Sequence, residues 1–111
     1  MRVISGIFKG KKIFLPEDEN TRPLRDLVKE SIFNLILHSK KIKPNIDSSS
    51  ILDLFSGTGS FGIECLSRGA NKITFVENHE NAIKVLKENL ENFNCKDKYK
   101  IIENDCFTYL S

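Results

Sequence analysis

The chain has 111 residues, of which 40% are apolar, so it is long enough for one small domain with a core and too apolar for a disordered segment. Its longest apolar runs are only a few residues, and none follows the first basic residue, so we expect neither a membrane span nor a secretory signal. The net charge of +2 conceals an asymmetry: residues 1–46 carry ten basic against five acidic side chains, and residues 47–111 carry seven against ten. The resulting balances of +5 and −3 suggest a basic arm that faces a polyanion, although a solvated basic surface would give the same pattern.

The three cysteines, Cys65, Cys95 and Cys106, are an odd number and form no CxxC pair. We therefore expect reduced thiols that fill the core of a cytoplasmic protein. No second ligand lies at metal-site spacing from any of them, so we expect no metal.

The front segment, residues 1–46, is predicted to form a basic β-hairpin followed by a helix. Residues 1–14 alternate loosely, and the basic residues of "KGKK" fall at the expected turn. A helix is expected from Pro23 to Ser39, because proline suits the first helical position and apolar residues follow at helical spacing. Those apolar residues are Leu24, Leu27, Val28, Ile32, Leu35 and Ile36. The charged and small residues of "KKIKPNIDSSS" are interpreted as a linker between two parts, with the boundary after residue 46.

Residues 47–111 are predicted to alternate between strands and helices. Strands are expected at 51–55, 72–76 and 100–103. One helix should contain Gly62 and end near Arg68 before Gly69, and another should run over 79–93 with Asn78 as its cap. A further helix should begin at Cys106. This alternation predicts an α/β, Rossmann-like fold with about three parallel strands.

The turn after the first strand, "SGTGS", is the strongest sequence signal for a ligand. Ligands of α/β sheets bind beyond the carboxyl ends of the strands, where this turn lies. "GTGSFG" matches G-x-G-x-x-G at Gly57, Gly59 and Gly62, and glycines let a ligand approach the backbone closely. Glu77 follows at the end of the second strand, where a carboxylate can accept hydrogen bonds from both ribose hydroxyls. A nucleoside-containing ligand is predicted.

Two further acids distinguish between candidate nucleosides. Asp53, just before the glycine turn, would repel the pyrophosphate of a dinucleotide but attract the ammonium and sulfonium groups of S-adenosylmethionine. Asp105, just past the third strand, could accept a hydrogen bond from an adenine amino group. Asp53 could instead brace the loop, and Asp105 could simply cap the helix that follows; neither role excludes ligand contact.

"DLFSGTGSFGIECLSRGA" together with "FVE" resembles the cofactor half of S-adenosylmethionine-dependent methyltransferases. "MRVISGIFKGKKI" followed by "TRPLRDLVKESIFNLI" resembles more specifically the bacterial 16S ribosomal RNA guanine-N2 methyltransferases of the RsmD type. The resemblance implies a substrate of 16S ribosomal RNA or a small-subunit assembly intermediate. It implies that the cofactor's methionine part is surrounded by Asp53, Ser56, Gly57, Thr58 and Gly59, that Glu77 holds the ribose, and that Asp105 with the Cys106 backbone holds the adenine. The RNA would face the hairpin and the T-R-P segment, at Lys9, Lys11, Lys12, Arg22 and Arg25.

The chain lacks the catalytic signature that this resemblance implies, an Asp or Asn followed by Pro-Pro and Tyr or Phe. Its only prolines are Pro16, Pro23 and Pro44, and no residue here is assigned a catalytic role. Phe55 and Phe61 are interpreted as packing residues rather than as a platform for a flipped base. We therefore expect a fragment of a methyltransferase that is inactive alone. The alternatives are a non-catalytic RNA-binding remnant and an NAD-dependent dehydrogenase domain, the latter opposed by Asp53 and the front segment.

Overall fold

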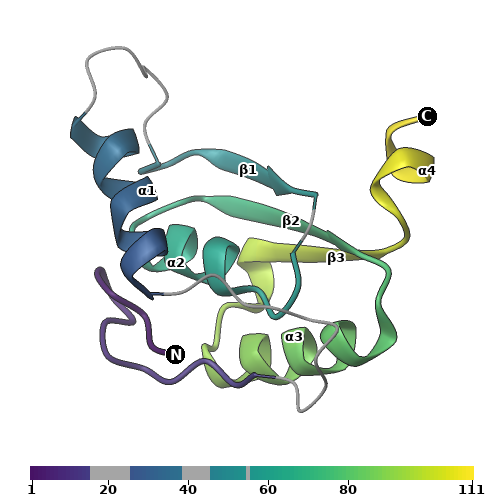
Figure 1. Ribbon diagram of the computed structural model, residues 1–111, viewed down its shortest axis with the longest axis horizontal. Helices are drawn as coiled ribbons and strands as arrows, with labels where there is room; N and C mark the ends of the chain where they lie inside the picture. The colour runs from purple at the N-terminus through teal and green to yellow at the C-terminus, as the bar shows by residue number, and fades with distance from the viewer. Residues whose placement is uncertain (16–25, 39–45, 55) are drawn as a thin grey trace.

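The computed structural model describes residues 1–15, 26–38, 46–54 and 56–111. The described residues confirm the predicted alternation of strands and helices, with element ends that differ from the expected ones by a few residues (Figure 1). The short 3-10 helix η1 was not predicted. In chain order the elements are α1 (Asp26–His38), β1 (Ser50–Asp53), α2 (Ser60–Ser67), β2 (Lys72–Glu77), α3 (Glu80–Asn92), η1 (Lys96–Lys98), β3 (Tyr99–Glu103) and α4 (Cys106–Leu110).

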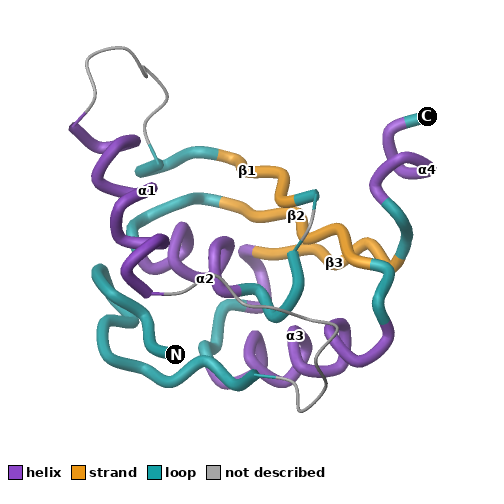
Figure 2. Tube along the Cα trace, in the orientation of Figure 1, coloured by secondary structure: helices purple, strands orange, loops and turns teal. Residues whose placement is uncertain are grey.

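The three strands form one parallel sheet, as the alternation predicts, and their order is β1-β2-β3 (Figure 2). Ile51 pairs with Ile73, and Phe75 pairs with Ile101. All three carboxyl ends therefore lie at one edge of the sheet, where the loops that follow β1, β2 and β3 meet. The fold is an incomplete Rossmann-like sheet.

One face of the sheet is covered by α2 and α3. The face of α3 predicted to be apolar is buried, with Leu86 and Leu90 at or below 1% exposure. Leu52, on the other face of the sheet, is 46% exposed. Because neighbouring strand residues point to opposite faces, the described elements bury one side of this sheet and leave the other more open.

The predicted β-hairpin at residues 1–14 is present only as an irregular turn. A single antiparallel bridge joins Arg2 to Lys12, and Gly6 and Gly10 both have positive φ. The segment is irregular because several of its amides bond outward to α2 instead of across the hairpin; Ile7 N, for example, donates to the Ser67 carbonyl at 2.9 Å. Val3 and Ile13 nevertheless enter the same core as the sheet and its helices.

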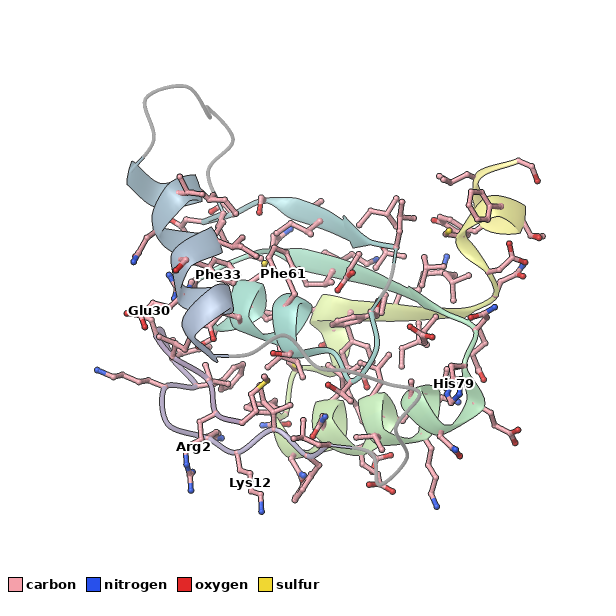
Figure 3. The ribbon with its side chains drawn as sticks, viewed as in Figure 1. Arg2, Lys12, Glu30, Phe33, Phe61 and His79 are labelled. Atoms are coloured by element: carbon pink, nitrogen blue, oxygen red, sulfur yellow. The ribbon has the colours of Figure 1, made fainter. Side chains whose placement is uncertain are left out.

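The predicted apolar stripe of α1 is only partly correct. Leu35 is 62% exposed, whereas Phe33, which was not assigned to the stripe, is fully buried. The Phe33 ring stacks on Phe61 at a centroid distance of 5.0 Å (Figure 3). The Arg68 guanidinium lies 4.3 Å from the centre of the Phe33 ring. Phe61 is therefore a packing residue, as expected. Phe55, Pro23 and the first apolar positions of the expected stripe lie outside the described residues or side chains.

Candidate functional site

A pocket of about 410 Å³ lies beyond the carboxyl ends of β2 and β3. It brings together three residues that the sequence assigned to a ligand: Glu77, Asp105 and Cys106. This is the position that ligands take in open α/β sheets. The lining is completed by Leu54, Asn78, Asn104 and Phe107.

The other five predicted cofactor residues, Asp53 and residues 56–59, do not line this pocket but are connected to it. The Gly57 amide donates to Glu77 Oε1 at 2.8 Å, which joins the glycine loop to the pocket wall. Gly57, with φ of 54°, is half-exposed, whereas Ser56, Thr58 and Gly59 are buried. The loop can therefore present mainly Gly57 to a ligand.

The other glycines of the G-x-G-x-x-G pattern are required by packing. A Cβ on Gly59 would come within 2.5 Å of Leu86 Cδ1 on α3. A Cβ on Gly62 would come within 2.2 Å of the Phe75 ring, so this glycine lets α2 approach the sheet. Of the three glycines, only Gly57 is therefore left to give a ligand room near the backbone. Gly59 and Gly62 are needed because α2 and α3 pack closely against the loop and the sheet.

Glu77 holds two backbone segments in place. Its Oε1 accepts from Gly57, and its Oε2 accepts from the His79 amide at 3.0 Å, just before α3 begins. Each carboxylate oxygen has two lone pairs, so the half-buried side chain keeps capacity for a ligand's hydroxyl groups. The N-cap of α3 is His79 rather than the predicted Asn78, and no side chain caps this helix.

Asp105 is the N-cap of α4, which confirms the simpler of its two interpretations. Its Oδ1 accepts from the Thr108 amide at 2.8 Å and its Oδ2 from the Thr108 hydroxyl at 2.6 Å. These hydrogen bonds stabilise the charged form and hold the pKa of Asp105 below its ordinary value of 3.8. The carboxylate is therefore ionised at neutral pH at the mouth of the pocket.

Asp53 ends β1, and its carbonyl accepts a 2.9 Å hydrogen bond from the Ser56 hydroxyl. Burial of Cys65 raises the pKa of its thiol, and the nearby negative charge of Asp53 raises it further, to about 12. Cys65 is thus a protonated, unreactive core residue at neutral pH. Cys95 and Cys106 are also buried, and none of the three forms a disulfide.

The three lysines predicted to contact RNA lie in the described N-terminal stretch, residues 1–15. Lys9, Lys11 and Lys12 are exposed. The Lys11 ammonium lies 5.3 Å from the centre of the Phe8 ring, and the Lys12 ammonium lies 5.6 Å from that of Phe14. Arg22 and Arg25, the other residues predicted to contact RNA, lie outside the described residues.

The turn that carries these lysines lies away from the pocket. Met1 contacts Ser60 at the start of α2, but Ile7 bonds to Ser67 at its end. Because α2 runs antiparallel to the strands, the turn reaches toward the amino edge of the sheet, whereas the pocket lies at the carboxyl edge. Figure 3 shows the same separation, with Lys12 on the front segment and His79 at the pocket end of α3.

Two buried polar residues that the sequence analysis missed attach the front segment to the domain. Glu64 on α2 is fully buried and accepts from the amides of Ile4 and Ser5 at 2.9 and 3.0 Å, and from Arg68 Nε at 2.8 Å. Asn89 on α3 is equally buried and bonds to the main chain of Phe14. The available signals were an acid within the largely apolar α2 and an amide beside the apolar face of the amphipathic α3.

The described ranges contain neither a metal-binding cluster nor a membrane-spanning helix. No group of three or more His, Cys, Asp and Glu residues there has an arrangement that could hold a metal ion. Among the same residues, every helix is too short or too polar to cross a membrane.

The whole chain, residues 1–111, matches the model of a protein family described as conserved hypothetical protein 95. The chain belongs to this family. A ribosomal RNA small subunit methyltransferase D from Haemophilus influenzae is 38% identical over 94% of the chain and 51% of its own length. A Bacillus subtilis protein, named as a candidate rRNA methyltransferase, is 42% identical over 95% of the chain and 54% of its own length. The chain thus spans about half the length of the curated relatives it matches.

Solved structures agree with this family assignment. A candidate methyltransferase from Escherichia coli superposes with a TM-score of 0.84 at 27% identity, over 100% of this chain and 56% of that one. A candidate methylase from Haemophilus influenzae gives a TM-score of 0.71 at 34% identity, over 99% and 55% of the two chains. These matches confirm the Rossmann-like fold predicted for this member of the family.

Proposed function

We propose that this chain is the N-terminal part of an S-adenosylmethionine-dependent methyltransferase that modifies the N2 atom of a guanine in 16S ribosomal RNA. The substrate is free RNA or a small-subunit assembly intermediate, and the enzyme works in the cytoplasm. The observation that carries the proposal is the pocket at the carboxyl edge, whose wall residue Glu77 is bonded to the glycine loop. The proposal is supported by relatives that are named as rRNA methyltransferases.

The residues around the pocket suit this cofactor. A volume of about 410 Å³ falls within the usual range for small-molecule sites, roughly 300–1,000 Å³. Glu77 would accept from the ribose hydroxyls, Asp105 from the adenine amino group, and the charge of Asp53 would attract the methionine ammonium. When bound, S-adenosylmethionine supplies an activated methyl group. The residues of this chain bind and orient it, and none of them is assigned a part in the chemical step.

The chemical step needs a set of groups that the N/D-P-P-Y/F motif would supply, and this sequence lacks that motif. The exocyclic amine of guanine is a poor nucleophile, so a carboxylate or amide and a backbone carbonyl must accept its protons while an aromatic ring stacks on the base. We propose that an N/D-P-P-Y/F motif beyond Ser111 supplies these groups. Sequencing the gene downstream of Ser111 tests this directly: an open frame containing the motif supports it, and a stop codon without the motif favours the non-catalytic RNA-binding alternative.

Calorimetric titration with S-adenosylmethionine tests the cofactor site. It should use the natural gene product, meaning the protein translated in frame to the gene's own stop codon. Glu77→Ala should weaken binding by about 1.5–3 kcal/mol, the range for hydrogen bonds to a charged group, which is roughly a 10- to 150-fold increase in Kd. Glu88→Ala, which removes an exposed acid from α3, is the charge-matched control and should leave Kd unchanged. Equal affinities for the Glu77 variant and the unmodified protein would remove Glu77 from the site.

The position of the basic turn limits how RNA can bind. A substrate that reaches both the pocket and the turn must extend along the helix layer, from the carboxyl edge of the sheet toward the amino edge. The lysines would then contact phosphates distant from the modified base. Such contacts strengthen binding without reading sequence, and the specificity would come from elsewhere in the protein.

A further inference from the structure

Asn89 is a fully buried polar side chain in the last turn of α3. Its hydrogen-bonding groups reach two segments that are distant in the sequence. The carboxamide oxygen accepts from the Phe14 amide at 2.7 Å, and the nitrogen donates to the Phe14 carbonyl at 3.1 Å and to the Thr58 carbonyl at 2.9 Å. One side chain therefore joins Phe14, near the end of the described residues 1–15, to the glycine loop through α3.

The bond to Thr58 fixes the loop from behind. The Thr58 carbonyl belongs to the same peptide unit as the Gly59 amide, which donates to the Ser56 carbonyl at 2.8 Å. Asn89 thus sets the orientation of this peptide, while Glu77 holds the Gly57 amide on the pocket side. The buried loop residues lie between these two anchors, so the exposed part of the loop depends on both.

The hydrogen bonds to Phe14 connect this network to the turn whose lysines are proposed to contact RNA. Phe14 lies two residues after Lys12, whose ammonium lies over its ring. All three bonds can form only when the loop and the front segment are both in place. A carboxamide group left unpaired in the core destabilises the protein, so ordering one segment favours ordering the other.

We propose that Asn89 is a positioning residue that couples the two substrates, so that S-adenosylmethionine and RNA each strengthen binding of the other. The inference rests on the proposed function. Coupling between two sites is reciprocal and typically amounts to about 5- to 150-fold in affinity. Because a single side chain joins the two backbone segments, we expect coupling in the lower part of that range. RNA should bind about 5- to 20-fold more tightly when the cofactor site is filled.

The test is a binding cycle on the natural gene product with small-subunit ribosomal RNA. The Kd for RNA is measured without ligand and with saturating S-adenosylhomocysteine, which carries no methyl group to transfer. In the unmodified protein the ligand should lower Kd by at least about fivefold, and in Asn89→Ala the ratio should fall to about one. Leu90→Ala, an apolar truncation one residue along the same helix, is the control that loses packing but keeps the ratio.

Two results overturn the inference. The first is a ratio of Kd values in Asn89→Ala equal to that of the unmodified protein. The second is a ratio of one in the unmodified protein when both ligands bind. Failure of either ligand to bind the unmodified protein overturns the proposed function as well. If Asn89→Ala does not fold, hydrogen exchange on the unmodified protein gives the answer. S-adenosylhomocysteine should slow exchange of the Phe14 amide at least about fivefold more than that of the Val3 amide, which bonds within the turn to Lys11. Equal slowing of both amides would show general stabilisation and overturn the coupling.

Discussion

Replacing Glu64 with glutamine should weaken the attachment of residues 1–15 to α2 although the side chain keeps its shape. The carboxylate accepts from two backbone amides and from Arg68, and it is fully buried. A carboxamide has one oxygen, so it can accept from only one of the two amides, and its NH₂ group would face the other donor. Arg68, whose side chain is 10% exposed, would lose its anionic partner.

The magnitude follows from these losses. One unpaired buried amide costs about 1–3 kcal/mol, and removing one partner of a buried ion pair costs about 3–5 kcal/mol. The losses overlap because they share one side chain, so we expect Glu64→Gln to lower the free energy of unfolding by about 3–5 kcal/mol. For a gene product about twice as long as this chain, as its relatives are, each kcal/mol shifts Tm by roughly 2–4 °C, so Tm should fall by at least about 6 °C.

Thermal unfolding followed by circular dichroism measures this shift in the natural gene product. Glu91→Gln removes an exposed carboxylate from α3 and should change Tm by less than about 2 °C. Hydrogen exchange should also accelerate at the amides of Ile4 and Ser5 in the Glu64 variant. A Glu64→Gln protein as stable as the control would refute the claim that this carboxylate anchors the front segment.

Three further predictions test other parts of the structure. Gly62→Ala should destabilise the protein by about 1–3 kcal/mol through overpacking against Phe75, and chemical denaturation showing no loss would mean that α2 can shift away from the sheet. Because its pKa lies below 3.8, ionised Asp105 stabilises the start of α4 above that pH, and this contribution should disappear as the pH falls through the lowered value. NMR shifts of α4 amides should report the change, and Asp105→Ala should remove it. Alanine at all three turn lysines should flatten the plot of log K against log salt, by about 0.7 for each lost phosphate contact, with cofactor affinity unchanged; an unaltered slope would favour a solvated surface. The lysines are Lys9, Lys11 and Lys12.

The parts of the fold that follow from local pattern could be predicted from the sequence. The strand around Ile51 is an apolar run between turn residues, and the buried face of α3 repeats at helical spacing. Asp105 caps α4 because aspartate before an apolar run is a local signal that depends on no distant partner. The pocket also followed from topology, since parallel strands place Glu77 and Asp105 at one edge.

The remaining features depend on contacts between distant residues. Glu64 bonds to amides 59 and 60 residues away, and Asn89 bonds to Phe14 at a separation of 75. Nothing near either residue in the sequence indicates these partners. The same limit explains the error at α1, where Phe33 is buried because α2 offers Phe61 and Arg68, whereas Leu35 fits the helical period but finds no described cover.

Methyl transfer tests the central claim most directly. The 111-residue chain and the natural gene product are each incubated with methyl-labelled S-adenosylmethionine and small-subunit ribosomal RNA. We expect label on a guanine N2 with a gene product that contains the N/D-P-P-Y/F motif, and none with the 111-residue chain. Label transferred by the 111-residue chain, or none transferred by a gene product that carries the motif, would contradict the account.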